Sequence, residues 1–177
     1  VVVDDGHLLV QRQWRAAVAE AVECPLAEVE TNVVVPVEEA TEKENFSAGT
    51  FRPRIHRKLD RYMVSLKRRK PRKDSLGLRL EGIDLRDPAR IIAGLNVDTS
   101  VGSAPDFRGG GREAKGRLRR FLDKGLRTYP ERRNDPNAEG QSGLSPYLHF
   151  GQLSPLEVAL KVREKGGEGA DEFLEEL

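Results

Sequence analysis

The sequence predicts a chain that is α/β in its first part and all-α in its last part, with a polar linker between the two. A β-branched run followed by an apolar stripe at helical spacing is typical of a strand and an amphipathic helix, and both stand near the start. Two more such stripes follow a middle region broken by proline and glycine. We therefore expect three parts, which are residues 1–66, 67–111 and 112–177.

The first part is predicted to run strand, helix, strand. Val1 to Val3 form the opening β-branched run. The helical stripe that follows comprises Val10, Trp14, Ala17, Val18, Ala21 and Val22. Pro25 ends this helix, and the loosely alternating run from Leu26 to Val35 indicates a second strand. This order usually forms half of a parallel sheet, and we expect Trp14 to lie in the core.

Local signals mark the turns and caps of this part. Asp4-Asp5-Gly6 follows the first strand and either binds a ligand or turns the chain, of which the turn is the commoner role. Ser47 is placed to cap a helix, and Pro53 predicts that the helix restarts there with proline at its first position. The apolar residues that then share one face are Ile55, Leu59, Tyr62 and Met63.

The 30 basic and 29 acidic side chains nearly cancel, so net charge alone does not indicate a nucleic-acid partner. Their distribution says more, because eleven Lys or Arg stand between Arg52 and Lys73 with Asp60 as the one acid. This stretch either contacts DNA phosphates or forms a solvated helix face and a charged linker. The second role is the commoner one for such runs.

Cys24 is the single cysteine, which excludes an internal disulfide and fits a reducing compartment. No apolar run approaches the roughly 20 residues of a membrane span, and no signal peptide is visible. We therefore expect a soluble, cytoplasmic protein. The chain opens inside a predicted strand without an initiator Met and closes inside a helical pattern, Asp171 to Leu177, so we expect a fragment that lacks both ends.

The expected linker, residues 67–111, begins with the proline-broken run KRRKPRKDS and ends at Gly109-Gly110-Gly111. A short helical turn is predicted inside it around Ile91. The stripe of the helix that follows comprises Ala114, Leu118, Phe121, Leu122 and Leu126. Ser154-Pro155-Leu156-Glu157 predicts a further helix that opens on a capping box with proline at its first position and ends at Gly166-Gly167.

Between these two helices lies a polar stretch, residues 128–154, which is the candidate site. Asn134 to Asn137 and Gly140 to Gly143 are turn or loop signals, with hydroxyls, amides and charges around them. Backbone amides in a loop of glycine and serine suit an anion such as phosphate. An ordinary polar connection is the alternative interpretation.

The order of residues in this stretch is more specific than its composition. YPERRNDP followed by GQSGLSPYLHFGQLSP resembles the flavin-binding segment of the DNA photolyase/cryptochrome family, most closely the class II cyclobutane pyrimidine dimer photolyases. The earlier runs VVVDDGHLLVQRQWR, NVVVPV and FRPRIHRKL are similar to that family as well. The resemblance implies the later part of a Rossmann-like domain that can hold an antenna chromophore, then a linker and the first helices of the helical FAD-binding domain. Glu38 and Glu39 depart from the family, which has aromatic or apolar residues there.

The resemblance also implies roles for particular residues. Tyr129 is similar to the tyrosine that contacts the flavin nucleotide in the family. Arg133 is similar to the arginine that meets the DNA backbone, with an ion pair to Asp135 or Glu131 as the alternative. The loop that would hold the pyrophosphate of FAD comprises Gln141, Ser142, Gly143, Leu144 and Ser145. The family has a threonine or a similar short residue where Gln141 stands. His149 is expected to buttress the loop, the catalytic residues stay unassigned, and no metal ligand is indicated.

The activity that the resemblance implies is light-driven repair of DNA. In photolyases, reduced FAD absorbs light and donates an electron to a cyclobutane pyrimidine dimer, which splits and returns the electron. We expect a monomer that acts on UV-damaged DNA. We expect the 177 residues alone to be inactive and to bind FAD weakly or not at all, since the other flavin contacts of the family lie beyond Leu177.

Two alternative functions stay open. One is a cryptochrome-like flavin photoreceptor without repair activity. The other is a basic nucleic-acid-binding module, which would explain the run from Arg52 to Lys73 but leave YPERRNDP unexplained.

Overall fold

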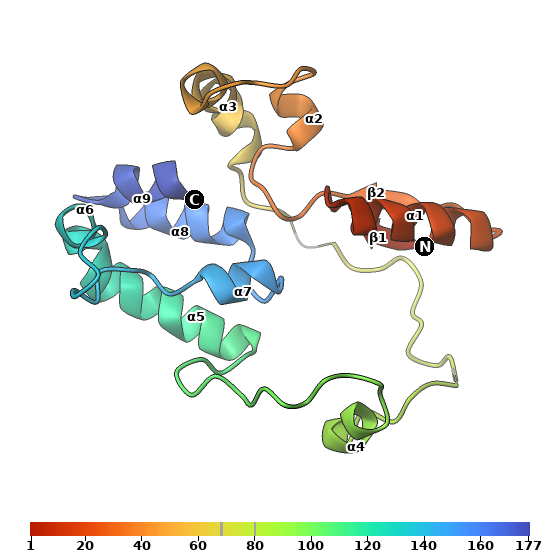
Figure 1. Cartoon of the computed structure of the whole chain (residues 1–177). Helices are drawn as coiled ribbons and strands as arrows, with labels where there is room; N and C mark the ends of the chain where they lie inside the picture. The colour runs from red at the N-terminus through yellow and green to blue at the C-terminus, as the bar shows by residue number, and fades with distance from the viewer. Residues whose placement is uncertain (68, 80) are drawn as a thin grey trace. The chain divides into compact units, whose positions relative to one another are not determined.

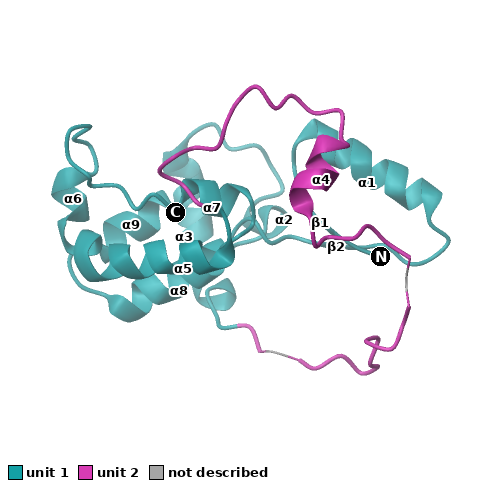
Figure 2. Cartoon of the chain, turned by 90° about the horizontal axis from the view of Figure 1, so that it is seen from below, with its two compact units in different colours: residues 1–65, 109–177 teal, residues 66–108 magenta. Residues whose placement is uncertain are grey.

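The computed structural model of the chain describes residues 1–67, 69–79 and 81–177 (Figure 1). Arg68, which belongs to the predicted basic run, lies outside the described residues. The chain forms two compact units, one made of residues 1–65 and 109–177 and the other of residues 66–108 (Figure 2). The predicted linker has nearly the bounds of the smaller unit, whereas the division of the chain into domains stays a prediction.

A small parallel sheet forms near the start, as predicted. Strand β1 (Val2–Asp4) pairs with strand β2 (Ala27–Val29), and helix α1 (Leu9–Ala21) connects the two strands. The prediction that the second strand runs to Val35 is wrong. Because the chain leaves the sheet after Asp5, whose N–H donates to the Val29 carbonyl, residues beyond Val29 have no partner strand there.

The prediction that Trp14 lies in the core is also wrong, because its side chain is 64% exposed. No residue of α1 is buried, although the helix has the predicted apolar stripe. Two strands of three residues each offer little apolar surface, and the described residues place no further layer over this stripe. The amphipathic spacing thus predicted the helix correctly, but it did not predict whether the helix is buried.

Helix α2 (Val37–Ala40) and helix α3 (Ala48–Tyr62) complete the first part. Ser47 caps α3 as predicted, since its hydroxyl accepts a hydrogen bond from the Thr50 N–H at 3.3 Å. The predicted restart at Pro53 is wrong, because α3 runs through this residue without a break. Proline removes a single N–H donor here, and the Gly49 carbonyl that would have accepted it lies near the exposed start of the helix.

The smaller unit, residues 66–108, has little regular structure. Its helix α4 (Pro88–Ala93) includes the short turn predicted around Ile91, and the Asp87 carboxylate caps it by accepting from the Arg90 N–H at 3.1 Å. Almost every described side chain of this unit is exposed.

The helical part begins with α5 (Gly111–Arg120), which continues into a π turn, η1 (Phe121–Gly125), and a 3₁₀ turn, η2 (Leu126–Thr128). Helix α6 (Tyr129–Arg132) follows directly. The predicted stripe is confirmed, because four of its five members are buried and Leu122 packs against them. The π turn adds a residue to one turn, which keeps Phe121 and Leu126 on the buried side.

Three further helices close this part: α7 (Ser145–His149), α8 (Pro155–Lys165) and α9 (Ala170–Glu176). The predicted start of α8 with proline in its first turn is confirmed, but the capping box is not, since the Ser154 side chain forms no cap hydrogen bond. Ser154 is exposed, so water can satisfy its hydroxyl instead. The apolar core gathers buried side chains from α5 through α9, including Leu118, Leu144, Val158 and Val162.

Among the described residues, no helix is both long enough and apolar enough to cross a bilayer.

Candidate functional site

The predicted loop lies between α6 and α7 and is held at both ends by helices. Its first half is the turn that the Asn-Asp-Pro-Asn run predicted. The Asp135 N–H donates to the Arg132 carbonyl at 3.2 Å, and the Asp135 carboxylate accepts from the Asn137 N–H at 2.9 Å. The second half, residues 140–145, carries two glycines and two serine hydroxyls.

The five residues of the predicted pyrophosphate loop differ in their surroundings. The Gln141 side-chain amide donates to the Arg133 carbonyl at 2.5 Å, and the Ser142 hydroxyl accepts from the Leu144 N–H at 3.3 Å. Leu144 is 1% exposed and anchors the loop in the core, whereas Ser145 is exposed at the start of α7. The loop is therefore fixed from inside and open on its polar side.

Three consecutive backbone donors of this loop are available. In the described part of the chain, the N–H groups of Gln141, Ser142 and Gly143 donate to no acceptor. Gly143 has a φ of +64°, and a Cβ added to it would lie 2.6 Å from Nη1 of Arg117. A glycine is therefore required there, and the guanidinium of Arg117 lies directly against the loop. Backbone donors beside a cation are suited to a phosphate group.

Tyr129 lies in the apolar core, where the sequence suggested a cofactor contact. Its side chain is 5% exposed, and its ring packs edge-on against Phe121 at 5.7 Å and Phe173 at 5.2 Å between centroids. Three aromatic rings from η1, α6 and α9 therefore hold the start of the site in place.

Arg133 is engaged by two groups at the surface. It forms an ion pair with Glu176, and its guanidinium lies 5.9 Å from the centroid of the Tyr129 ring. Hydrogen bonding to the Glu176 carboxylate raises the pKa of Arg133, which keeps it cationic at any working pH. The alternative of an ion pair is therefore realised, but with Glu176 rather than with the predicted Asp135 or Glu131. His149 is exposed and packs edge-on against Phe150 at 4.7 Å between ring centroids.

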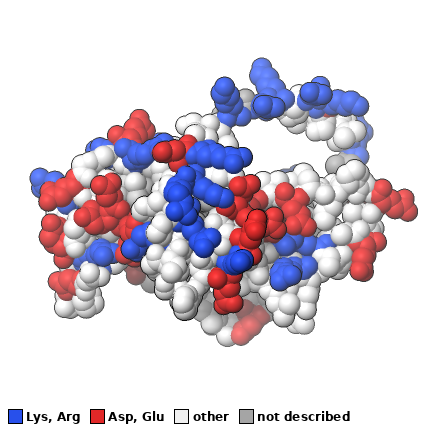
Figure 3. All heavy atoms as spheres, turned by 90° about the horizontal axis from the view of Figure 1, so that it is seen from above, with Lys and Arg blue, Asp and Glu red and all other residues white. Residues whose placement is uncertain are grey.

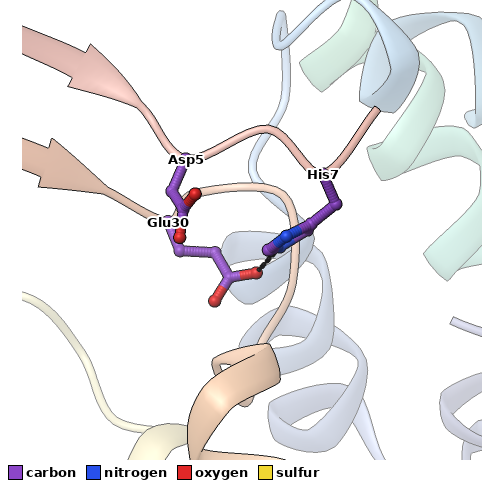
Figure 4. A group of neighbouring side chains, drawn as sticks. All are labelled: Asp5, His7 and Glu30. Atoms are coloured by element: carbon purple, nitrogen blue, oxygen red, sulfur yellow. Dashed lines mark hydrogen bonds and ion pairs between the residues drawn. The ribbon is translucent and has the colours of Figure 1, made fainter. Parts of the chain in front are cut away.

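A second cluster of polar side chains lies at the end of the sheet, at Asp5, His7 and Glu30 (Figure 4). One ligand atom from each lies within 4.8 Å of the others, which is close enough for a metal ion. These atoms, however, already have hydrogen-bond or ion-pair partners within the chain. His7 Nε2 lies 2.5 Å from Glu30 Oε1, the other Glu30 oxygen accepts from the Val37 N–H at 2.9 Å, and Asp5 pairs with Arg15 at 2.9 Å.

The contacts of this cluster connect the residues after β1 to those after β2 and to α1, which is a structural role. The neighbouring Asp4 carboxylate likewise accepts hydrogen bonds from Thr31 at 2.7 Å and Asn32 at 3.0 Å. These contacts turn the chain from β2 toward α2. The turn predicted at Asp4-Asp5-Gly6 is therefore the better supported of the two interpretations.

The structure also contains an apolar cavity that the sequence did not indicate. Its volume is about 700 Å³, and its lining includes Val35, Ile55, Met63 and Leu174. Three of the polar groups at its edge contact one another, since Glu175 contacts Arg52 and lies 3.3 Å from His56. Few polar groups are left to orient a ligand, so the loop at residues 141–145 is the better candidate site.

No protein-family model matches the chain. Curated relatives nevertheless match almost all of it. It is 45% identical over 177 residues to the deoxyribodipyrimidine photo-lyase of Methanothermobacter thermautotrophicus, a match that covers 99% of this chain and 38% of the relative. The enzyme of the same name from Potorous tridactylus is 29% identical, over 99% of this chain and 34% of the relative. The enzyme of this name from Arabidopsis thaliana is 35% identical, over 85% of this chain and 32% of the relative.

The chain thus spans between about a third and two fifths of the length of these relatives. The matches cover the sheet, the smaller unit and the helices that hold the loop, since the first two extend along almost the whole chain. The resemblance predicted from the sequence is confirmed: the chain is similar along nearly all of its length to deoxyribodipyrimidine photo-lyases, and it fits a part of such an enzyme.

Proposed function

We propose that this chain serves the light-dependent repair of cyclobutane pyrimidine dimers in DNA, as the part of a deoxyribodipyrimidine photo-lyase where the flavin site begins. Its similarity to enzymes of that name along almost its whole length carries the proposal. The relatives described above are all named photo-lyases, which favours repair over a photoreceptor. A basic binding module would account for the charges but not for the structure of the loop.

The residues of the loop fit the pyrophosphate of FAD. Two phosphates need several donors without bulk, and the loop offers the N–H groups of Gln141, Ser142 and Gly143. The hydroxyl of Ser145 is exposed beside them, and the Arg117 guanidinium supplies a positive charge. No carboxylate stands within residues 141–145 to repel the phosphates.

The chemistry divides between the cofactor and the chain. Bound FAD would supply the absorption of light and the electron. The loop would hold the phosphates of the cofactor. The aromatic rings packed around Tyr129 would keep α6, and with it the start of the loop, in a fixed position. Arg133 would contact a DNA phosphate by exchanging its Glu176 partner for the phosphate. This exchange is easy because Glu176 is 52% exposed, and exposed ion pairs are weak.

A chimera provides the test. This chain would replace the matching segment of the Methanothermobacter thermautotrophicus enzyme, and the purified protein would be assayed for bound flavin and for dimer repair in light and darkness. We expect bound FAD and repair in light alone. A folded chimera, judged by circular dichroism, that retains no flavin would contradict the proposal.

Two serine variants of the chimera test the loop itself. Ser145→Ala should weaken FAD binding about tenfold, because a hydrogen bond to a charged group contributes about 1.5 kcal/mol. Ser154→Ala is the matched control, since Ser154 is also exposed, precedes a proline at a helix start and makes no cap hydrogen bond. Equal FAD affinity in the two variants would show that the Ser145 hydroxyl does not hold the cofactor.

A further inference from the structure

The run from Lys67 to Lys73, called the basic segment below, differs from the bases that precede it. Six of its seven residues are Lys or Arg, and it opens the smaller unit. The described bases of the segment are Lys67, Arg69, Lys70, Arg72 and Lys73, and all five are exposed. None of the five forms an ion pair or a hydrogen bond with any described residue.

Three of the five bases on α3 have acidic partners instead. Arg52 contacts Glu175, while Lys58 and Arg61 both lie within 4.0 Å of Glu39. The predicted basic stretch from Arg52 to Lys73 therefore divides into a helix in which most cations have acidic partners and a segment whose described cations have none. The five described positive charges of the basic segment face the solvent without internal neutralisation.

The charges of the segment follow one another closely in the sequence, and the chain bends at Arg72 and Lys73. No helix or strand includes its described residues, and Pro71 favours an extended conformation in the residue before it. In an extended chain six cations in seven residues stand about 4 Å apart, since each residue spans about 3.3 to 3.6 Å. One DNA strand carries a phosphate about every 3.4 Å along the helix axis, so a closely spaced run of cations meets a comparably dense run of negative charge.

We propose that the basic segment binds the phosphate backbone of nucleic acid without reading its sequence. The partner rests on the proposed function, in which this protein acts on DNA. Figure 3 shows Lys and Arg side chains following one another along the upper edge of the view with no acidic side chain between them. The segment itself holds no apolar residue besides Pro71, so it has nothing to insert into a bilayer or to bury against another protein.

The segment would act separately from Arg133. Arg133 must exchange its ion pair with Glu176 before it can contact a phosphate, whereas the described bases of the segment have no partner to leave. Lysine and arginine contacts to phosphates release counterions and supply the salt-dependent, sequence-independent part of binding. The segment therefore provides a first, general attraction to DNA, and Arg133 adds a contact to one phosphate once its ion pair opens.

The test changes all five described bases of the segment to glutamine. The matched control changes five equally exposed bases of α5 and η1 to glutamine: Arg112, Lys115, Arg119, Arg120 and Lys124. Both variants lose the same charge. Binding to a duplex with one cyclobutane dimer and to the same duplex undamaged would be measured between about 50 and about 200 mM salt.

The segment variant should bind both duplexes at least tenfold more weakly at low salt. The slope of log K against log salt should become shallower by about 2 to 4, since each lost phosphate contact removes about 0.9. The control should keep most of its slope. Equal losses in the two variants would mean that only net charge matters and would overturn the proposal. Binding of the segment to anionic vesicles with no effect on either duplex would overturn it as well.

The same data separate this proposal from the proposed function. Preference for the damaged duplex reports on dimer recognition, whereas the salt slope on undamaged DNA reports on the segment. Suppose that neither the unchanged chain nor either variant prefers the damaged duplex, and that the slope of log K against log salt is still shallower in the segment variant. The proposed repair function then fails, whereas the proposal for the basic segment holds. Because the segment has no helix or strand in its described residues, the variant should keep the circular dichroism spectrum of the unchanged chain.

Discussion

The surroundings of Tyr129 and Arg133 depend on residues that are distant in the sequence. Tyr129 and Arg133 stand four residues apart, and the resemblance assigned one to the flavin and the other to DNA. Folding places Tyr129 among aromatic rings and pairs Arg133 with Glu176, which is 43 residues further along the chain. A local motif can identify the residue that is suited to a ligand, but a partner this distant becomes visible only when the helices pack.

Gly169 is the residue where the fold tolerates least change. Its φ is +88°, and a Cβ added to it would lie 2.0 Å from the Leu126 carbonyl oxygen and 3.1 Å from Cδ of Pro130. We expect Gly169→Ala to lower the free energy of unfolding by about 2 to 4 kcal/mol, because it combines backbone strain with a clash against main chain. Urea denaturation followed by circular dichroism measures this loss.

Gly167→Ala is the matched control for this substitution. Gly167 also has a positive φ, +86°, but no atom lies within 4 Å of the added Cβ. It should cost about 1 to 2 kcal/mol, the price of the left-handed conformation alone. Equal losses in the two variants would show that α9 can move away from η2 without cost.

At the scale of elements, amphipathic spacing predicts a helix more reliably than it predicts what the helix packs against. Helix α5 and helix α1 both show a clear stripe in the sequence. The stripe of α5 lies in the core, whereas no residue of α1 is buried. Pro53 gives a similar lesson, since α3 runs without a break through a residue that usually ends a helix.

Trp14 allows a direct test of the exposed face of α1, because it is the only tryptophan. We expect its fluorescence emission to be that of a water-exposed indole and to be strongly quenched by iodide. Trp14→Ala should change the free energy of unfolding by less than about 1 kcal/mol, whereas Leu118→Ala, in the core, should lower it by about 2 to 5 kcal/mol. A blue-shifted, poorly quenched emission would show that a partner covers this face.

At the scale of the whole molecule, the main feature is that two segments far apart in sequence share one compact unit. Residues 1–65 and 109–177 are joined by contacts such as the hydrogen bond from Arg163 to the Met63 carbonyl at 2.7 Å. Met63 itself is 5% exposed. Residues 66–108 form a unit of their own with little regular structure.

Limited proteolysis tests this arrangement. Trypsin cleaves after lysine and arginine, so its first cuts should fall in the exposed basic segment. The two products should then elute together from a sizing column in native buffer and separate in urea, because the contacts within the larger unit do not depend on the cut peptide bond. First cuts within α5 to α9, or separation of the products in native buffer, would contradict the assignment of both segments to one unit.

The sequence by itself determined the local structure and the resemblance to photo-lyases. Apolar spacing predicted α1, α5 and α8, Ser47 and Pro155 marked helix starts, and an ordered run of polar residues indicated the photolyase resemblance that the relatives confirm. These features depend on residues that are near one another in the chain, where steric preference and hydrogen bonding act directly.

The tertiary structure decided which surfaces are covered and which charges are paired. Whether Trp14 is buried, whether Arg133 meets Glu176 and which bases between Arg52 and Lys73 keep a free charge all depend on groups brought together from distant positions. Burial and ion pairing are properties of such encounters rather than of a residue type. Side chains of the same kind therefore became core residues, members of ion pairs or exposed charges according to what packed beside them.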